Sequence, residues 1–168
     1  IDSTFAWASP YILPNPITVA PEVRLIWCCN NEGSMRRDIV VYSYPYTDEN
    51  TFTLDYLNAK RDAVLSRVVT ASVDGSYMGT EYKVFPPQMR AITVQEDEYA
   101  TEVRGLWKIL DGEAMGGPYV SHTRLDQVNG RVVTAETFLY AAGQKKRSAL
   151  RQAEAILYTL QLPQDTIK

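Results

Sequence analysis

Five strand patterns follow one another between Glu81 and Tyr140, and this succession constrains the fold more than any other feature of the chain. The segments are EYKVF, MRAITVQ, YATEVRGLWKI, YVSHTRLD and RVVTAETFLY. Strands that are joined by short turns usually pair as antiparallel hairpins. The last turn contains Asn129 and Gly130, which suit the positive φ angles of a tight hairpin. A two-residue turn at these positions would place His122 opposite Thr137.

Two further strands, VRLIWCCN and DIVVYSYPY, precede this region, and only two segments have helical periodicity. The first helix is expected from Thr53 to Val68 and the second from Gln144 to Leu162. The predicted order is therefore β-β-α-β-β-β-β-β-α. We expect an α+β fold, in which an antiparallel β-sheet has both α-helices packed on one face.

The predicted helices and the longest predicted strand each have one apolar side. Thr53 is expected to be the N-cap of the first helix, and residues 70–80 are expected to form a long loop. In the strand YATEVRGLWKI, alternation predicts that Trp107 is buried while Glu102 and Arg104 are exposed.

Length and composition favour one main domain. The chain has 168 residues, of which 45% are hydrophobic, and this is enough for one ordinary core. We expect a proline-rich arm or linker at residues 1–22 and a single α+β domain at residues 23–168. The net charge of -3 disfavours nucleic-acid binding. No apolar run approaches the roughly 20 residues that span a bilayer.

Several motifs resemble an uncharacterised bacterial family, the domain-of-unknown-function family 4837. They are YSYPYTDENTFTLDYLNAKRD, GSYMGTEY, RGLWK, MGGPYVSHTRLD and KKRSALRQAEAILYTLQL. The resemblance covers Arg24 to Leu162 and implies that the chain corresponds to the C-terminal part of such a protein. It also implies an exported lipoprotein of the periplasm or cell envelope, attached to the membrane only through a lipid anchor that this chain lacks. The element order is also similar to the PsbP type of α+β sandwich.

The only histidine of the chain, His122, is the first candidate for chemistry. Ser121 precedes it directly, but consecutive strand residues face opposite sides, so the two cannot form a catalytic pair. A hydrolase would need His122 together with a loop serine, Ser72 or Ser76, and with Asp111 or Asp126. The alternative is that His122 is a half-exposed strand residue and that residues 116–118, Gly-Gly-Pro, shape a turn.

Metal and cofactor chemistry is not expected from these residue types. One histidine and the adjacent Cys28 and Cys29 cannot provide three ligands for a transition metal without carboxylates. We therefore expect no metal site and no cofactor.

Two groups of residues are candidates for binding. Tyr42, Tyr44 and Tyr46 share one strand face and could form an aromatic platform, although packing beneath a helix or across strands is the more ordinary role of such side chains. Basic residues gather where the last helix begins and could bind an anion or remain solvated. The candidate binding residues are Tyr42, Tyr44, Tyr46, His122, Arg124, Lys145, Lys146, Arg147 and Arg151.

The absence of a catalytic pattern favours a non-enzymatic domain that binds or scaffolds another envelope component. The partner would be a protein, peptide or glycan of the envelope. The alternative is a hydrolase that uses His122 with loop residues.

Overall fold

The computed structural model describes residues 6–7, 23–29, 35–68, 75–95, 98–112, 114–141, 143 and 145–162. The strands are β1 (Ala6–Trp7), β2 (Val23–Cys29), β3 (Met35–Pro45), β4 (Tyr77–Glu81), β5 (Gln88–Gln95), β6 (Glu98–Leu110), β7 (Gly116–Asp126), β8 (Arg131–Ala141) and β9 (Leu160–Gln161). The helices are α1 (Leu54–Val68) and α2 (Arg147–Leu157), and a 3-10 turn, η1 (Glu49–Phe52), precedes α1. In the part of the chain that is described, neither helix is long and apolar enough to cross a membrane.

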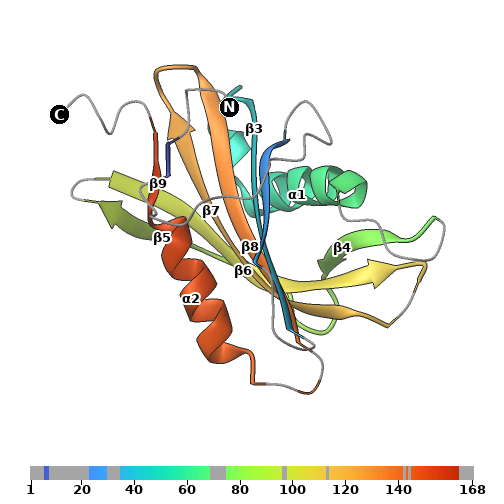
Figure 1. Ribbon diagram of the computed structural model, residues 1–168. Coiled ribbons are helices and arrows are strands. Elements are labelled where there is room, and N and C mark those ends of the chain that lie inside the picture. Colours follow the sequence, from blue (N-terminus) through green and yellow to red (C-terminus); the bar gives the residue numbers. More distant parts are fainter. Residues whose placement is uncertain are drawn as a thin grey trace.

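Seven of the described strands form one curled antiparallel sheet (Figure 1). Its order is β2-β3-β8-β7-β6-β4, and β5 also pairs with β6. The short strands β1 and β9, which the sequence patterns did not predict, pair with each other. The predicted α+β class and the antiparallel sheet are confirmed. Apart from β1, the predicted arm at residues 1–22 lies outside the described residues, and the PsbP-like aspect stays a prediction.

The prediction that both helices pack on one face of the sheet is wrong. On β3, Val40 and Tyr42 belong to the core beneath α1, whereas Ile39 and Val41 belong to the core beneath α2. Because neighbouring strand residues point to opposite faces, the two helices cover opposite faces (Figure 1). We call these the α1 face and the α2 face. The continuous apolar run of β3 is the physical reason, since a strand that is buried on both sides does not alternate.

The predicted first helix is confirmed, and Thr53 caps it as expected. The Thr53 Oγ1 atom accepts a hydrogen bond from the backbone N–H of Tyr56 at 3.4 Å. Leu57, Val64 and Leu65 of α1 are buried against the sheet. The helix thus covers an aromatic-rich core on the α1 face.

The second helix is shorter than its periodicity predicted. It ends at Leu157, because the backbone N–H and the hydroxyl of Thr159 both donate to the Ile156 carbonyl and close a turn. Leu160 then enters β9 and is still buried on the α2 face. Leu160 is therefore buried on the same face as the helix residues, as its spacing suggested, but it lies in a strand and not in the helix.

β4 and β5 occupy the same edge of β6, one after the other. Glu81 at the end of β4 is opposite Leu106, and Gln88 at the start of β5 is opposite Arg104. The six residues between them, 82–87, leave the sheet and return two positions along β6, and we call this segment the excursion. The predicted strand EYKVF is therefore wrong beyond Glu81, and the predicted loop at residues 70–80 includes most of β4.

The alternation of β6 is confirmed for Trp107, which is buried on the α1 face. The predicted exposure of Glu102 is wrong, since its side chain is 0% exposed, and Arg104 is only partly exposed. Tyr99, which lies on the same strand face as Trp107, is exposed. The α2 face of β6 is thus covered at Glu102 and partly covered at Arg104, where alternation predicted solvent exposure.

The glycines before His122 also lie in a strand instead of a turn. Residues 116–118 begin β7, and the turn is made earlier, where Asp111 has a positive φ and Ile109 N–H donates to Met115 O. A Cβ on Gly117 would overlap the carbonyl oxygen of Leu139. Gly117 therefore permits close approach of backbone, not a reversal of the chain.

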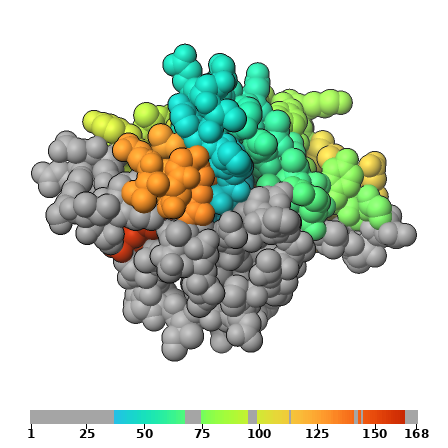
Figure 2. Space-filling view, turned by 90° about the horizontal axis from the view of Figure 1, so that it is seen from above, coloured from blue at the N-terminus to red at the C-terminus, as the bar shows by residue number. Residues whose placement is uncertain are grey.

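The β7–β8 turn is longer than two residues. Asp126 is opposite Arg131, so His122 is opposite Ala135 instead of the predicted Thr137. Beside this turn, the N–H of Tyr46 donates to the carbonyl of Gly130, and Figure 2 shows the same end of the molecule from above.

Candidate functional site

A buried carboxylate lies at the centre of the most polar cluster on the α2 face. Glu102 on β6 is opposite Arg90 of β5 on one side and opposite His122 of β7 on the other. The sheet register therefore places these three residues in one row across neighbouring strands. Their side chains can meet because directly opposite residues share a face.

Two arginines bind the Glu102 carboxylate. The Nε atoms of Arg90 and Arg104 each donate to Oε1 at 2.6 Å. The Nη2 atom of Arg104 donates to Oε2 at 2.9 Å. Hydrogen bonds between charged groups are the strong ones, and here they compensate the burial of Glu102.

These contacts keep Glu102 ionised. Burial raises its pKa, but the His122 ring and the guanidinium groups of Arg104 and Arg90 lower it by more, so the pKa lies well below the usual range. The carboxylate likewise raises the pKa of Arg104. At neutral pH the cluster therefore holds an ionised carboxylate and two cations.

His122 is the unusual member of the cluster. It is 2% exposed, so the expectation of a half-exposed residue is wrong. Its Nε2 atom lies 3.4 Å from Oε2 of Glu102, yet neither ring nitrogen makes a hydrogen bond to any described residue. The ring of Tyr158 contacts it edge-on, with 4.7 Å between centroids. The helix α2 explains this burial, because its C-cap residue Tyr158 covers the ring.

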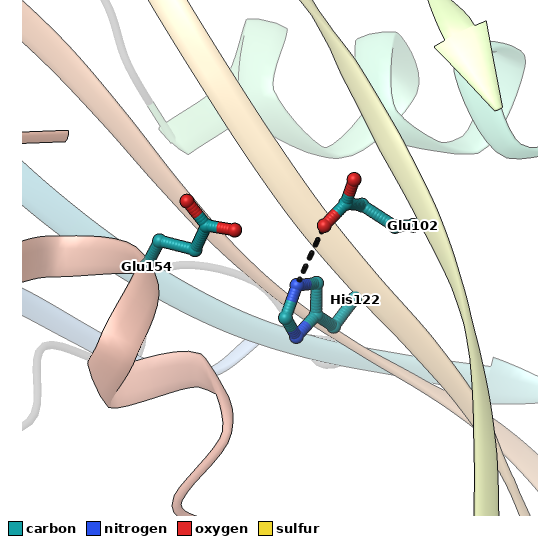
Figure 3. Close-up of side chains that lie close together, drawn as sticks. All are labelled: Glu102, His122 and Glu154. Atoms are coloured by element: carbon teal, nitrogen blue, oxygen red, sulfur yellow. Dashed lines mark ion pairs between the residues drawn. The ribbon is translucent and has the colours of Figure 1, made fainter. Parts of the chain in front are cut away.

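A second carboxylate reaches the cluster from α2. Glu154 points from the helix toward Glu102 and His122 (Figure 3), and Arg104 Nη2 donates to its Oε1 atom. One ligand atom from each of Glu102, His122 and Glu154 lies within 4.8 Å of the others. The three residues come from β6, β7 and α2, which are far apart in the sequence.

The described surroundings of His122 do not include the partners that hydrolysis requires. Ser121 faces the opposite side of the sheet, and Ser72 lies outside the described residues. Ser76 precedes β4, whose Tyr77 pairs with Leu110, roughly 26 Å along β6 from Glu102 at about 3.3 Å per residue. Asp111 directly follows that same end of β6.

The remaining predicted acid, Asp126, is used in the β7–β8 turn. It accepts hydrogen bonds from the backbone and side chain of Asn129 and from Arg131. The geometry thus brings His122 to two glutamates and not to Ser76, Asp111 or Asp126.

A second buried charge lies on the α1 face. Arg61 of α1 donates to both carboxylate oxygens of Glu136 on β8 at distances of 2.7 to 3.0 Å. Its Nη1 atom also donates to Thr80, and its guanidinium lies 3.8 Å from the centroid of the Tyr119 ring. Although burial lowers the pKa of Arg61, Glu136 raises it by more. Both side chains of this ion pair are buried, and the Arg61 guanidinium also contacts Thr80 and the Tyr119 ring.

The three tyrosines of β3 do not form an exposed platform. Tyr42 and Tyr44 are buried in the α1-face core, where their rings are stacked 6.4 Å apart. Tyr46 is partly exposed and contacts Phe52. Packing beneath a helix, the alternative given above, therefore describes Tyr42 and Tyr44.

The predicted basic residues are separated into two environments. Arg124 is buried and donates to the Leu160 carbonyl. Lys145, Arg147 and Arg151 are exposed near the start of α2. Lys146 occupies the N-cap position without a side-chain capping bond. The cysteine side chains at positions 28 and 29 lie outside what the structure describes.

A family model described as a domain of unknown function, DUF4837, matches residues 12–159. The chain belongs to the DUF4837 family. The match covers most of the chain, including β2 to β8 and both helices. No curated protein matches the sequence.

In this DUF4837 chain, the sequence patterns missed Glu102, Glu154, Arg90 and Arg104 as members of one site. Each falls at an ordinary polar position of a strand or helix. A signal was present in the charged pair Glu102 and Arg104, which share a strand face. Without the register of β5 and β7 and the position of α2, this signal could not be joined to His122.

Proposed function

We propose that this chain is a non-enzymatic cell-envelope domain that binds a partner protein through the excursion at residues 82–87. The observation that carries the proposal is the exposure of apolar side chains in this segment. Val84 is 80% exposed and Phe85 is 56% exposed, while Tyr82 is also exposed beside them. Exposed apolar groups that lie together commonly mark interaction sites.

The excursion is held in a defined shape. The Glu81 carboxylate accepts hydrogen bonds from the backbone N–H groups of Lys83 and Val84, at 2.6 and 3.2 Å. Lys108 also binds Glu81, and these contacts lower its pKa to about 2, the lysine being the largest cause. The backbone is therefore ordered before a partner arrives, which reduces the entropy lost on binding.

The excursion is also tied to α1 and stiffened by prolines. The Tyr82 hydroxyl donates to Asp62 at 2.9 Å, and Asp62 also accepts from the backbone and hydroxyl of Thr80. Residues 86 and 87 are both proline, which fixes φ at two adjacent positions. An ordered apolar projection suits a protein groove better than a glycan, which needs more polar groups.

Two further considerations support a binding role in the envelope. The resemblance to exported lipoproteins implies that compartment. The surroundings of His122 do not favour the hydrolase alternative, because its ring nitrogens make no hydrogen bond to a hydroxyl among the described residues. A binding domain needs no such contact.

The test is capture of a partner from an envelope extract, compared among three forms of the chain. The wild type and a Val128→Asp variant should enrich the same protein. A Val84→Asp, Phe85→Asp variant should lose it. Val128 is the matched control because it is apolar and, like Phe85, 56% exposed, but lies in the β7–β8 turn.

A photo-crosslinking residue at position 85 provides a direct second readout. It should form an adduct with the captured protein, whereas the same residue at position 128 should not. Equal capture by all three forms, or adducts from both positions, would contradict the proposal. Urea unfolding of each variant shows whether a loss of capture reflects the surface instead of the fold.

A further inference from the structure

We propose that Glu102, His122 and Glu154 form a binding site for a divalent transition-metal ion such as Zn²⁺, and that the ion competes with Arg104 for the two carboxylates. The site goes beyond the proposed function and holds whether or not the excursion binds a protein. The sequence has too few suitably spaced histidines and cysteines for three metal ligands, and in this site the two carboxylates provide the other two ligands beside His122.

The donor set matches this class of ion. One imidazole nitrogen and two carboxylate oxygens are ligands that Zn²⁺ accepts, with a fourth position left for water. The imidazole favours a transition metal over Ca²⁺ or Mg²⁺, which prefer oxygen ligands alone. Two carboxylates would neutralise the charge of a divalent ion.

The spacing of the donors is close to that of a bound site. His122 Nε2 and Glu102 Oε2 are 3.4 Å apart. Two ligands at about 2.0–2.1 Å from a tetrahedral zinc ion lie about 3.4 Å from each other. The Glu154 ligand atom lies within 4.8 Å of the other two, so this side chain, which extends from α2, is the donor that must move closer (Figure 3).

The buried ring of His122, whose only polar contact among the described residues is the 3.4 Å approach to Glu102, is an independent indication. A buried polar group without a hydrogen bond costs free energy, and such groups are uncommon in folded proteins. Both His122 nitrogens are buried without a hydrogen bond to a described residue. A metal ion bound to Nε2 would replace the long contact with Glu102 Oε2 by a direct bond, on the same side as both carboxylates.

Arg104 occupies the position of a competing cation. Its Nη2 atom contacts both Glu102 and Glu154, so one guanidinium group bridges the two proposed carboxylate ligands. Arg90 binds only Oε1 of Glu102 and can remain there while Oε2 binds the ion. The side chain of Arg104 is 35% exposed, which gives it room to turn toward solvent.

The experiment is a titration of the untagged chain with ZnCl₂, followed by calorimetry and by thermal unfolding. The wild type should bind one ion per chain and unfold at a higher temperature with zinc than without it. Glu154→Gln and His122→Asn should each weaken binding at least tenfold. Arg104→Gln should strengthen binding, because the competing cation is removed.

Two controls separate this site from other zinc ligands. Glu49→Gln removes an exposed carboxylate in η1 and should leave binding unchanged. Cys28→Ser, Cys29→Ser should also bind zinc as the wild type does. Co²⁺ in place of Zn²⁺ should give visible absorption bands without the intense near-ultraviolet band of thiolate ligands.

The proposal is overturned if neither the wild type nor Arg104→Gln binds one zinc ion. It is equally overturned if binding survives unchanged in Glu154→Gln and His122→Asn, or is lost with the cysteines. Gln has nearly the same shape as Glu, so the Glu154→Gln variant should fold normally, and circular dichroism checks this. Partner capture through the excursion is a separate measurement, so the two proposals can fail independently.

Discussion

The two faces of the sheet both bury charge, but they do so in different ways. On the α1 face, Arg61 meets both oxygens of Glu136 and is covered by the Tyr119 ring. On the α2 face, Glu102 is bound by arginines that reach solvent, and His122 lies beside it without a hydrogen bond to any described residue. In the first arrangement both charged groups are buried and hydrogen-bonded to each other. In the second, the arginines that bind Glu102 are accessible to solvent and can be replaced by another cation. Burial alone therefore does not identify a functional group, and the state of its partners is more informative.

The largest loss of stability should come from breaking the buried ion pair between Arg61 and Glu136. Glu136→Ala leaves the buried guanidinium of Arg61 without its carboxylate, and the free energy of unfolding should fall by about 3–5 kcal/mol. Urea unfolding followed by circular dichroism measures this loss. A loss below about 1 kcal/mol would mean that Arg61 readily reaches water, and the contrast between the two faces would not hold.

The carboxylate on the α2 face should instead appear in the pH dependence of stability. The pKa of Glu102 is lowered in the folded state, so its contribution is present above the unfolded value near 4.3 and is lost as the pH falls toward the folded pKa. Its contribution to the slope is at most about 1.4 kcal/mol per pH unit.

Glu102→Gln tests this contribution directly. Between pH 5 and 3, urea unfolding of the variant should depend less on pH than that of the wild type. Glu49→Gln is the exposed control and should retain the slope of the wild type. An identical slope for Glu102→Gln would show that the arginines do not hold this carboxylate in its ionised form.

Replacing His122 should cost less than opening the pair on the α1 face. Because its ring nitrogens make no hydrogen bond to described residues, His122→Ala should lower the free energy of unfolding by no more than about 1–2 kcal/mol. Chemical unfolding in the absence of metal measures this. A loss as large as that of Glu136→Ala would mean that the ring is a structural requirement of the α2 face.

The smallest effect should come from Arg90. Its side chain is 63% exposed, and solvent screens its contact with Glu102. Arg90→Ala should leave the free energy of unfolding nearly unchanged, and added salt should reduce any remaining difference. If the variant is destabilised as much as Glu136→Ala, the two faces do not differ in the way described.

The order of the main elements could be predicted from the sequence because each pattern is local. The helix α1 follows from a capping threonine and from Leu57, Val64 and Leu65 at helical spacing. The burial of Trp107 follows from the alternation of β6. These features depend on residues within one element, so neighbouring sequence is sufficient to find them.

What could not be predicted depends on distant partners. Glu102 appeared exposed because alternation gives the side of a strand and not what covers it. The second face of the sheet was missed, although the apolar run Ile39 to Tyr42 on β3 indicated it. The site itself needs the pairing of Glu102 with His122 and the position of Glu154 on α2, and no local pattern contains these.

The excursion also offers a place to lengthen the chain. Because β4 and β5 both remain paired with β6, a linker inserted between Val84 and Phe85 begins and ends at fixed points on one strand. The closure entropy of an inserted flexible linker grows only slowly with its length. A small fluorescent reporter could therefore be carried at this position without separating the sheet, and its signal would come from the surface that is proposed to meet the partner.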